Sequence, residues 1–120
     1  MRLWGGLVAL LMLSPVQAQA LSTFTLQCAG RSVMQVSLMG GGMITMAWSG
    51  QFYVGHEGGQ RHLASGDAVR WFQLQNGDEL WRDKARGRDF IAYAGSGRLT
   101  PCQAGAEQEL KVQPLPRVPG

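Results

Sequence analysis

The feature that most constrains the fold is a two-residue alternation of apolar and polar side chains that glycines repeatedly interrupt. In segments 24–28, 34–38 and 44–48 every second residue is apolar, which is typical of strands with one buried face. Asn76-Gly77 favours a tight hairpin because both residues tolerate positive φ. No stretch keeps a 3.6-residue period. We therefore predict roughly seven or eight short antiparallel strands that form a small barrel or a sandwich.

Composition supports a β protein over a helical one. The chain of 120 residues contains 17 Gly, and 16% of its residues are charged. An ordinary domain has about 7% Gly and roughly 25% charged residues, whereas a helical bundle has little Gly and many Ala, Glu and Lys. The length allows one domain and excludes an enzyme with a separate cofactor-binding half.

Residues 1–20 have the pattern of a secretory signal peptide. Arg2 precedes an apolar run over 3–13, and Ala18 and Ala20 form an A-x-A cleavage site. A transmembrane anchor needs about 20 apolar residues, and this run is much shorter. We therefore expect an exported, periplasmic protein without a membrane span.

The two cysteines, Cys28 and Cys102, both follow this leader. Cys28 lies far beyond the apolar run and follows Gln27, where a lipoprotein signal needs a small residue. A lipid anchor is therefore not expected. An oxidising compartment favours a Cys28–Cys102 disulfide, which in the chain-entropy model contributes roughly 4–4.5 kcal/mol. A free catalytic thiol is the alternative, and it would leave the second cysteine unpaired.

The chain is mildly basic, and most of its basic residues lie in its second half. The formal net charge is +3. Six of the basic residues in that half are Arg70, Arg82, Lys84, Arg86, Arg88 and Arg98. Asp78, Glu79, Asp83 and Asp89 are interleaved with them, which is typical of a solvated face, although a basic face also fits an acidic cleft. Export argues against a nucleic-acid partner.

Catalytic motifs are almost absent. His56 and His62 are the only histidines, whereas a zinc site needs three or four ligands. The glycine-rich segments match no phosphate-binding loop, and Ser65 lacks the flanks of a nucleophile elbow. A carboxylate pair of a small hydrolase stays open as an alternative. We expect a protein that is not an enzyme and carries no metal or cofactor.

Candidate recognition residues lie in the predicted connections. Ser65 falls in a turn and Lys84 near a strand end, and binding residues usually lie on such loops. Trp71 and Trp81 are on predicted strands, and we expect both in the core.

From Phe24 to Gln103 the chain resembles the c-type lysozyme inhibitors of Gram-negative bacteria, the MliC and PliC family. Four short motifs carry the resemblance along the chain. They are Phe24–Cys28, Ala64-Ser65-Gly66 with Arg70-Trp71, Leu80-Trp81 with Lys84, and the closing Cys102-Gln103. Two of these motifs depart from the family pattern. Val69 stands where the first motif has an aromatic residue, and the second motif has one extra residue before Lys84 and Ala85 where glycine is usual.

The resemblance implies a small antiparallel β-barrel closed by the disulfide, and a loop that enters the lysozyme cleft. Ser65 and Lys84 would reach the two catalytic carboxylates of the lysozyme, and Arg82 or Arg86 would serve where Lys84 does not. Gly66 and Arg70 are carried over as neighbouring contacts. The alternative is a barrel of the same fold that binds another envelope partner.

The predicted organisation has three parts. A signal peptide covers residues 1–20, and the barrel domain covers 21–103. Residues 104–120 form a flexible tail, because Pro114, Pro116 and Pro119 oppose regular strand pairing.

Overall fold

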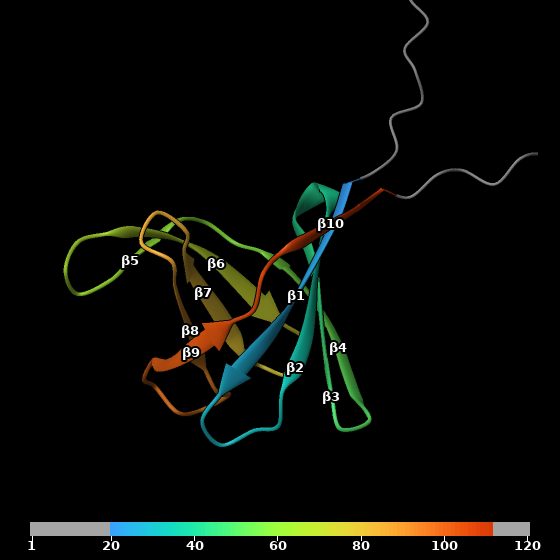
Figure 1. Ribbon diagram of the computed structural model, residues 1–120. Helices are drawn as coiled ribbons and strands as arrows, with labels where there is room; N and C mark the ends of the chain where they lie inside the picture. Colours follow the sequence, from blue (N-terminus) through green and yellow to red (C-terminus); the bar gives the residue numbers. More distant parts are fainter. Residues whose placement is uncertain (1–19, 112–120) are drawn as a thin grey trace, which may run out of the picture.

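Ten short strands follow one another along the computed structural model, which describes residues 20–111 (Figure 1). Their bounds are β1 Ala20–Cys28, β2 Met34–Met39, β3 Met43–Trp48, β4 Gln51–Glu57, β5 Arg61–His62, β6 Ala68–Leu74, β7 Glu79–Asp83, β8 Arg88–Ala92, β9 Thr100–Ala104 and β10 Gln108–Lys111. A 3₁₀ turn, η1, spans Gly40–Gly42 between β2 and β3. No helix in this part of the chain has the length and apolar character needed to cross a membrane.

Eight of the strands close into an antiparallel barrel. Its order is β1-β2-β3-β4-β6-β7-β8-β9, and β9 returns to pair with β1. Cys28 on β1 lies opposite Cys102 on β9, and the two form a disulfide at this seam. The predictions of a small antiparallel barrel and of this disulfide are therefore confirmed.

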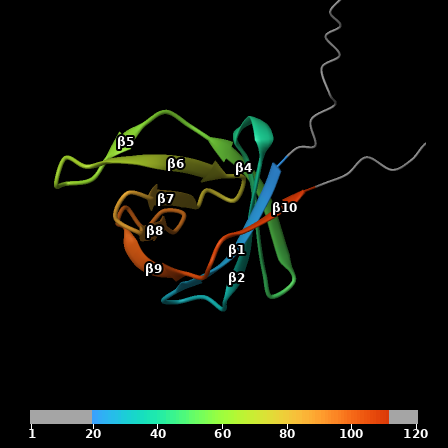
Figure 2. The same ribbon diagram turned by 45° about the horizontal axis from the view of Figure 1, so that its top comes forward.

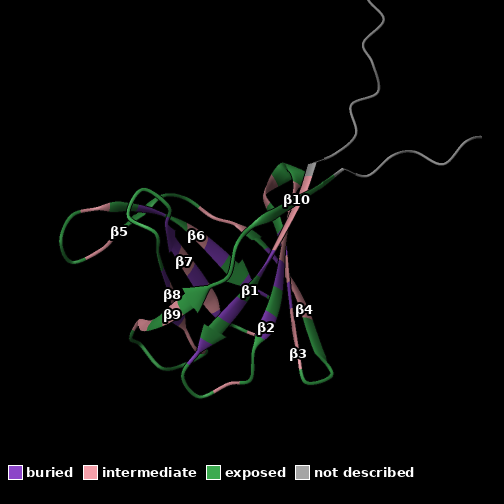
Figure 3. Ribbon diagram, in the orientation of Figure 1, coloured by how far each residue is buried: buried purple, intermediate pink, exposed green. Residues whose placement is uncertain are grey.

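The barrel interior holds the apolar face that the alternation predicts. Strand residues point alternately to the two faces of a sheet, and one face of β1, β2, β3, β6, β7 and β8 supplies the buried cluster. Figure 3 shows the buried segments along these ribbons. The buried set comprises Phe24, Leu26, Cys28, Met34, Val36, Ile44, Met46, Phe72, Leu74, Leu80 and Ile91. These side chains leave the opposite face of each strand for solvent or for ligands.

Two tryptophans depart from the expected core placement. Trp71 pairs with Trp81 across β6 and β7, and the next pair in the register is Phe72 with Leu80. Since Phe72 and Leu80 are buried in the interior, the tryptophans lie on the outer face, where both are partly exposed. The prediction that Trp71 and Trp81 fill the core is wrong, because smaller apolar residues of the same strands fill it.

Strand pairing extends further than the expected domain end at Gln103. β9 includes Ala104, and β10 pairs with residues 20–23 of β1. β9 pairs only with residues 26–28 of β1. It leaves the same edge of β1 unpaired over residues 20–23, and β10 pairs with β1 there. The prediction of a flexible tail from residue 104 is therefore wrong as far as Lys111. The signal peptide, apart from Ala20, and the tail prolines lie outside the described residues.

One end of the barrel is closed by an ion pair. Asp78, in the turn between β6 and β7, contacts Arg31 in the connection between β1 and β2, with Nη1 and Oδ2 2.7 Å apart. The Arg31 guanidinium also stacks on Trp48, 3.9 Å from the ring centroid, and on Tyr93. We call this the closed end. The opposite end carries η1 and the turn between β7 and β8, and we call it the open end.

Gly55 allows β4 and β6 to approach closely. It pairs with Leu74, and a Cβ at residue 55 would lie 2.1 Å from the carbonyl oxygen of Gln73. We expect Gly55→Ala to lower the free energy of unfolding by about 3 kcal/mol, because β6 must move away. Thermal unfolding checks this, with Gly40→Ala as the matched control, since a Cβ there meets nothing within 4 Å. Equal melting temperatures of the two variants would contradict the prediction.

Candidate functional site

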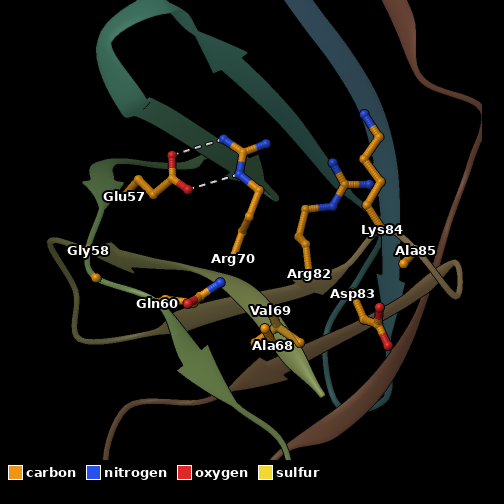
Figure 4. A pocket seen from close by; sticks show the side chains of 11 residues that line it. Glu57, Gly58, Gln60, Ala68, Val69, Arg70, Arg82, Asp83, Lys84 and Ala85 are labelled. Carbon is orange, nitrogen blue, oxygen red and sulfur yellow. Dashed lines mark hydrogen bonds and ion pairs between the residues drawn. The ribbon is translucent and has the colours of Figure 1, made fainter.

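The open end of the barrel contains a cavity of about 310 Å³ with a charged lining (Figure 4). The connection between β4 and β5 forms one wall, and β6, β7 and the turn after β7 form the others. The charged residues that line it are Glu57, Arg70, Arg82, Asp83 and Lys84. Three of these were predicted from the sequence as partner contacts, namely Arg70, Arg82 and Lys84.

Arg70 forms a two-point ion pair at the rim of this cavity. Its Nε and Nη2 each donate to the Glu57 carboxylate, both at 2.9 Å (Figure 4). The hydrogen bond from Arg70 lowers the pKa of Glu57, although burial opposes the shift. The guanidinium also lies over the Phe72 ring. Arg70 is thus held in one orientation by its own neighbours.

Arg82 lies inside the barrel wall and is only 8% exposed. Its Nε donates to Asp89 at 2.7 Å, and its Nη1 donates to Glu107 at 3.2 Å. The guanidinium stacks 4.0 Å from the centroid of the Phe24 ring. These contacts connect β7 to β8 and to β1, and removing either carboxylate would leave part of the buried charge of Arg82 without a partner. Arg82 therefore faces the protein's own carboxylates more than it faces solvent.

Lys84 begins the turn between β7 and β8 and is the most exposed of the cavity's cations. Its side chain is 68% exposed, and Nζ lies 3.9 Å from Glu107. Glu107 also accepts hydrogen bonds from Ser22 and Arg82. The bond from Ser22 contributes most to the lowered pKa of Glu107, which burial opposes and Arg82 reinforces. Lys84 is free to turn toward a partner, because exposed ion pairs are weak.

Ser65 and Gly66 form the tip of the hairpin between β5 and β6. Gly66 has φ of +93° and its N–H donates to Leu63 O at 2.8 Å, which closes a tight turn that favours glycine. Ser65 Oγ donates to Asp67 at 2.8 Å, and both Ser65 and Gly66 are exposed. These two residues lie outside the lining of the cavity.

The hairpin tip and the β7–β8 turn are tied together by an ion-pair network. Asp67 accepts from Arg86 at 3.1 Å and from Arg88 at 3.3 Å, and Arg88 also donates to Asp83 at 2.6 Å. The bond from Arg88 lowers the pKa of Asp83 despite burial. The hairpin reaches beyond the barrel wall in both views (Figure 2). The structure therefore places the loop of Ser65 next to the loop of Lys84.

Sequence reasoning missed the carboxylates that organise this end of the barrel. Each of four carboxylates forms an ion pair with one or two basic residues at this end, namely Glu57, Asp67, Asp83 and Glu107. Only Asp83 belongs to the interleaved acidic residues that are typical of a solvated face, whereas Glu57, Asp67 and Glu107 lie outside that set. Position alone does not reveal that Glu107 reaches back across the barrel to Arg82.

The histidines lie on β4 and β5 with exposed side chains. Among residues 20–111 no three His, Cys, Asp or Glu side chains are grouped closely enough to hold a metal ion.

Fold and site together define a small disulfide-closed β-barrel that presents a hydroxyl and several cations on adjoining loops. Comparisons with protein-family models, with curated proteins and with solved structures find no match for this chain.

Proposed function

We propose that this protein is an exported inhibitor of c-type lysozyme that inserts the loops of Ser65 and Lys84 into the active-site cleft. The proposal rests on the family resemblance in segments 64–71 and 80–84. The observation that carries it is the network through Asp67, whose ion pairs with Arg86 and Arg88 hold the hairpin tip of Ser65 beside the turn that Lys84 begins. A single partner surface can therefore contact both.

The chemistry of the loops suits such a cleft. A retaining glycosidase holds two carboxyl groups about 5 Å apart. The Ser65 hydroxyl and the Lys84 ammonium are exposed donors, and donors bound to carboxylates form strong charge-assisted hydrogen bonds. Arg86 belongs to the same turn and is 54% exposed, so it supplies a second cation. The ion pairs of Asp67 reduce the loop ordering that binding would otherwise require.

A second candidate function is a barrel of this fold that binds a different envelope partner. The hydrogen bond from Ser65 to Asp67 favours it, because it occupies the hydroxyl proton and places a carboxylate at the hairpin tip. Like charges across an interface are unfavourable. In a lysozyme complex Asp67 must therefore keep its contacts with Arg86 and Arg88.

The first test is inhibition by the purified mature protein. We expect it to slow the lysis of a cell-wall substrate by a c-type lysozyme. Ser65→Ala and Lys84→Ala should each weaken inhibition about tenfold or more, which is the loss expected for a hydrogen bond to a charged group. Their melting temperatures should stay at the wild-type value, because both side chains are exposed.

Ser37→Ala on β2 is the matched control, and we expect it to inhibit like the wild type. Unchanged lysis under a large molar excess of the protein would reject the inhibitor function. Capture of a different envelope component without lysozyme binding would support the second candidate.

A further inference from the structure

A second cavity lies on the outer face of the barrel, away from the open end. Its volume is about 320 Å³, and β7 and the connection between β8 and β9 form its walls. Glu79, Trp81, Tyr93, Arg98 and Leu99 contribute the larger side chains of its lining. None of these residues lines the cavity of the open end.

Trp81 is held in place beside this cavity by Glu79 and Trp71. The indole N–H groups of Trp71 and Trp81 both donate to Glu79 Oε1, at 2.8 and 3.0 Å. Arg61 stacks on Trp71, 4.0 Å from the ring centroid. Gly58 packs so closely against Trp71 that a Cβ there would lie 1.9 Å from Cζ3. Trp71 is thus a fixed support, and Trp81 presents a fixed aromatic surface to the cavity.

Two polar groups complete the cavity. Glu79 Oε2 accepts no hydrogen bond from the described residues, because both indoles use Oε1. Arg98 is exposed and forms no ion pair within residues 20–111. The backbone that carries Arg98 is fixed, since its N–H donates to Ser96 Oγ at 3.3 Å and Gly95 and Gly97 adopt positive φ. A carboxylate oxygen and a guanidinium therefore flank an aromatic surface.

This combination favours a neutral ring that carries hydroxyl groups. An anionic ligand would be repelled by Glu79, and an apolar ligand would bury Glu79 and Arg98 without partners, which is costly. A sugar ring has an apolar C–H face that packs on an indole, and vicinal hydroxyls that bond to carboxylate and guanidinium groups. Concave sites with an aromatic wall and few polar groups are typical of small-ligand binding.

We propose that the cavity beside Trp81 binds a neutral sugar ring of a glycan. Trp81 stacks on the ring, Glu79 accepts from its hydroxyls, and Arg98 donates to them. This site is separate from the loops of Ser65 and Lys84, so it does not depend on lysozyme inhibition.

Titration of the full mature protein with chitotriose, cellotriose and maltotriose tests the proposal. The sugars are added up to about 10 mM, about tenfold above a Kd of 1 mM that is typical of weak binding. At least one should give a saturable change in tryptophan fluorescence and a matching calorimetric signal. Trp81→Ala should weaken that binding about tenfold or more, as for a central aromatic contact.

Arg98→Ala keeps the proposal testable if Trp81→Ala does not fold. It should weaken binding about tenfold with an unchanged melting temperature, because Arg98 makes no ion pair that the fold needs. Gln27→Ala, on an exposed position of β1, is the control and should bind like the wild type. No saturable binding of any of the three sugars would overturn the proposal. Binding that Arg98→Ala leaves unchanged would also overturn it.

Discussion

Removal of the disulfide is expected to lower the free energy of unfolding by about 4 kcal/mol. Cys28 and Cys102 are 74 positions apart and lie opposite one another where β1 meets β9. This seam closes the barrel, and in the chain-entropy model a crosslink over so long a loop greatly restricts the unfolded chain. A small domain buries only a modest core, so the crosslink is a large share of its stability.

Urea unfolding followed by tryptophan fluorescence measures the effect. The Cys28→Ala/Cys102→Ala variant should unfold at a much lower urea concentration than the oxidised wild type. A reductant should destabilise the wild type similarly and leave the double variant unaffected, which controls for effects of the reductant itself. A double variant as stable as the oxidised wild type would contradict the prediction.

The barrel was predictable because its determinants are local. A period of two in segments 24–28, 34–38 and 44–48 selects strands, and a turn signal such as Asn76-Gly77 selects antiparallel neighbours. The pairing of Cys28 with Cys102 required only that both cysteines be oxidised. The sequence did not distinguish a closed barrel from a sandwich of two sheets, because strands in both alternate apolar and polar residues.

The placement of Trp71 and Trp81 was not predictable from the same pattern. β6 carries large apolar side chains on both faces, and Phe72 and Leu74 compete with Trp71 for the interior. A two-residue period separates the two faces of a strand but does not say which one is inside. The size of the tryptophans favours placing them in the interior, whereas the structure buries the face of β6 that carries Phe72.

The candidate site was predictable only in part for a related reason. Ser65 and Lys84 came from short motifs, and the structure shows that their loops adjoin. The contacts that join them are long-range, from Asp67 to Arg86 and from Glu107 to Arg82. Such pairs are set by the register of β6, β7 and β10, which sequence patterns do not fix at single-residue precision.

The second large loss of folding stability is expected when the Arg31–Asp78 ion pair at the closed end is removed. Asp78 is only 2% exposed, and its carboxylate accepts hydrogen bonds from Arg31, Asn76 and the N–H of Ala94. It thereby joins three connections between strands. We expect Asp78→Ala to lower the free energy of unfolding by about 3 kcal/mol or more, because the change leaves Arg31 without its buried partner.

A double-mutant cycle with Arg31→Met isolates the pair from the other bonds of Asp78. Urea unfolding of the wild type, Asp78→Ala, Arg31→Met and the double variant supplies the four free energies. The two single losses should add up to clearly more than the loss in the double variant, since each single change already breaks the pair. Strictly additive losses would mean that Asp78 acts through Asn76 and Ala94 alone.

The same contact predicts a pH dependence of defined sign. Burial works against ionisation of Asp78, but the hydrogen bonds from Arg31, Ala94 and Asn76 outweigh it and lower the pKa in the folded protein. A carboxylate whose pKa is lowered in the folded protein contributes stability above its unfolded pKa of about 4. It loses this contribution as the pH falls through the folded pKa. Asp78→Asn cannot ionise, so it should be less stable than the wild type at neutral pH and approach it in acid. A stability difference between the two proteins that stays constant from neutral to strongly acidic pH would show that the charge of Asp78 does not hold the closed end together.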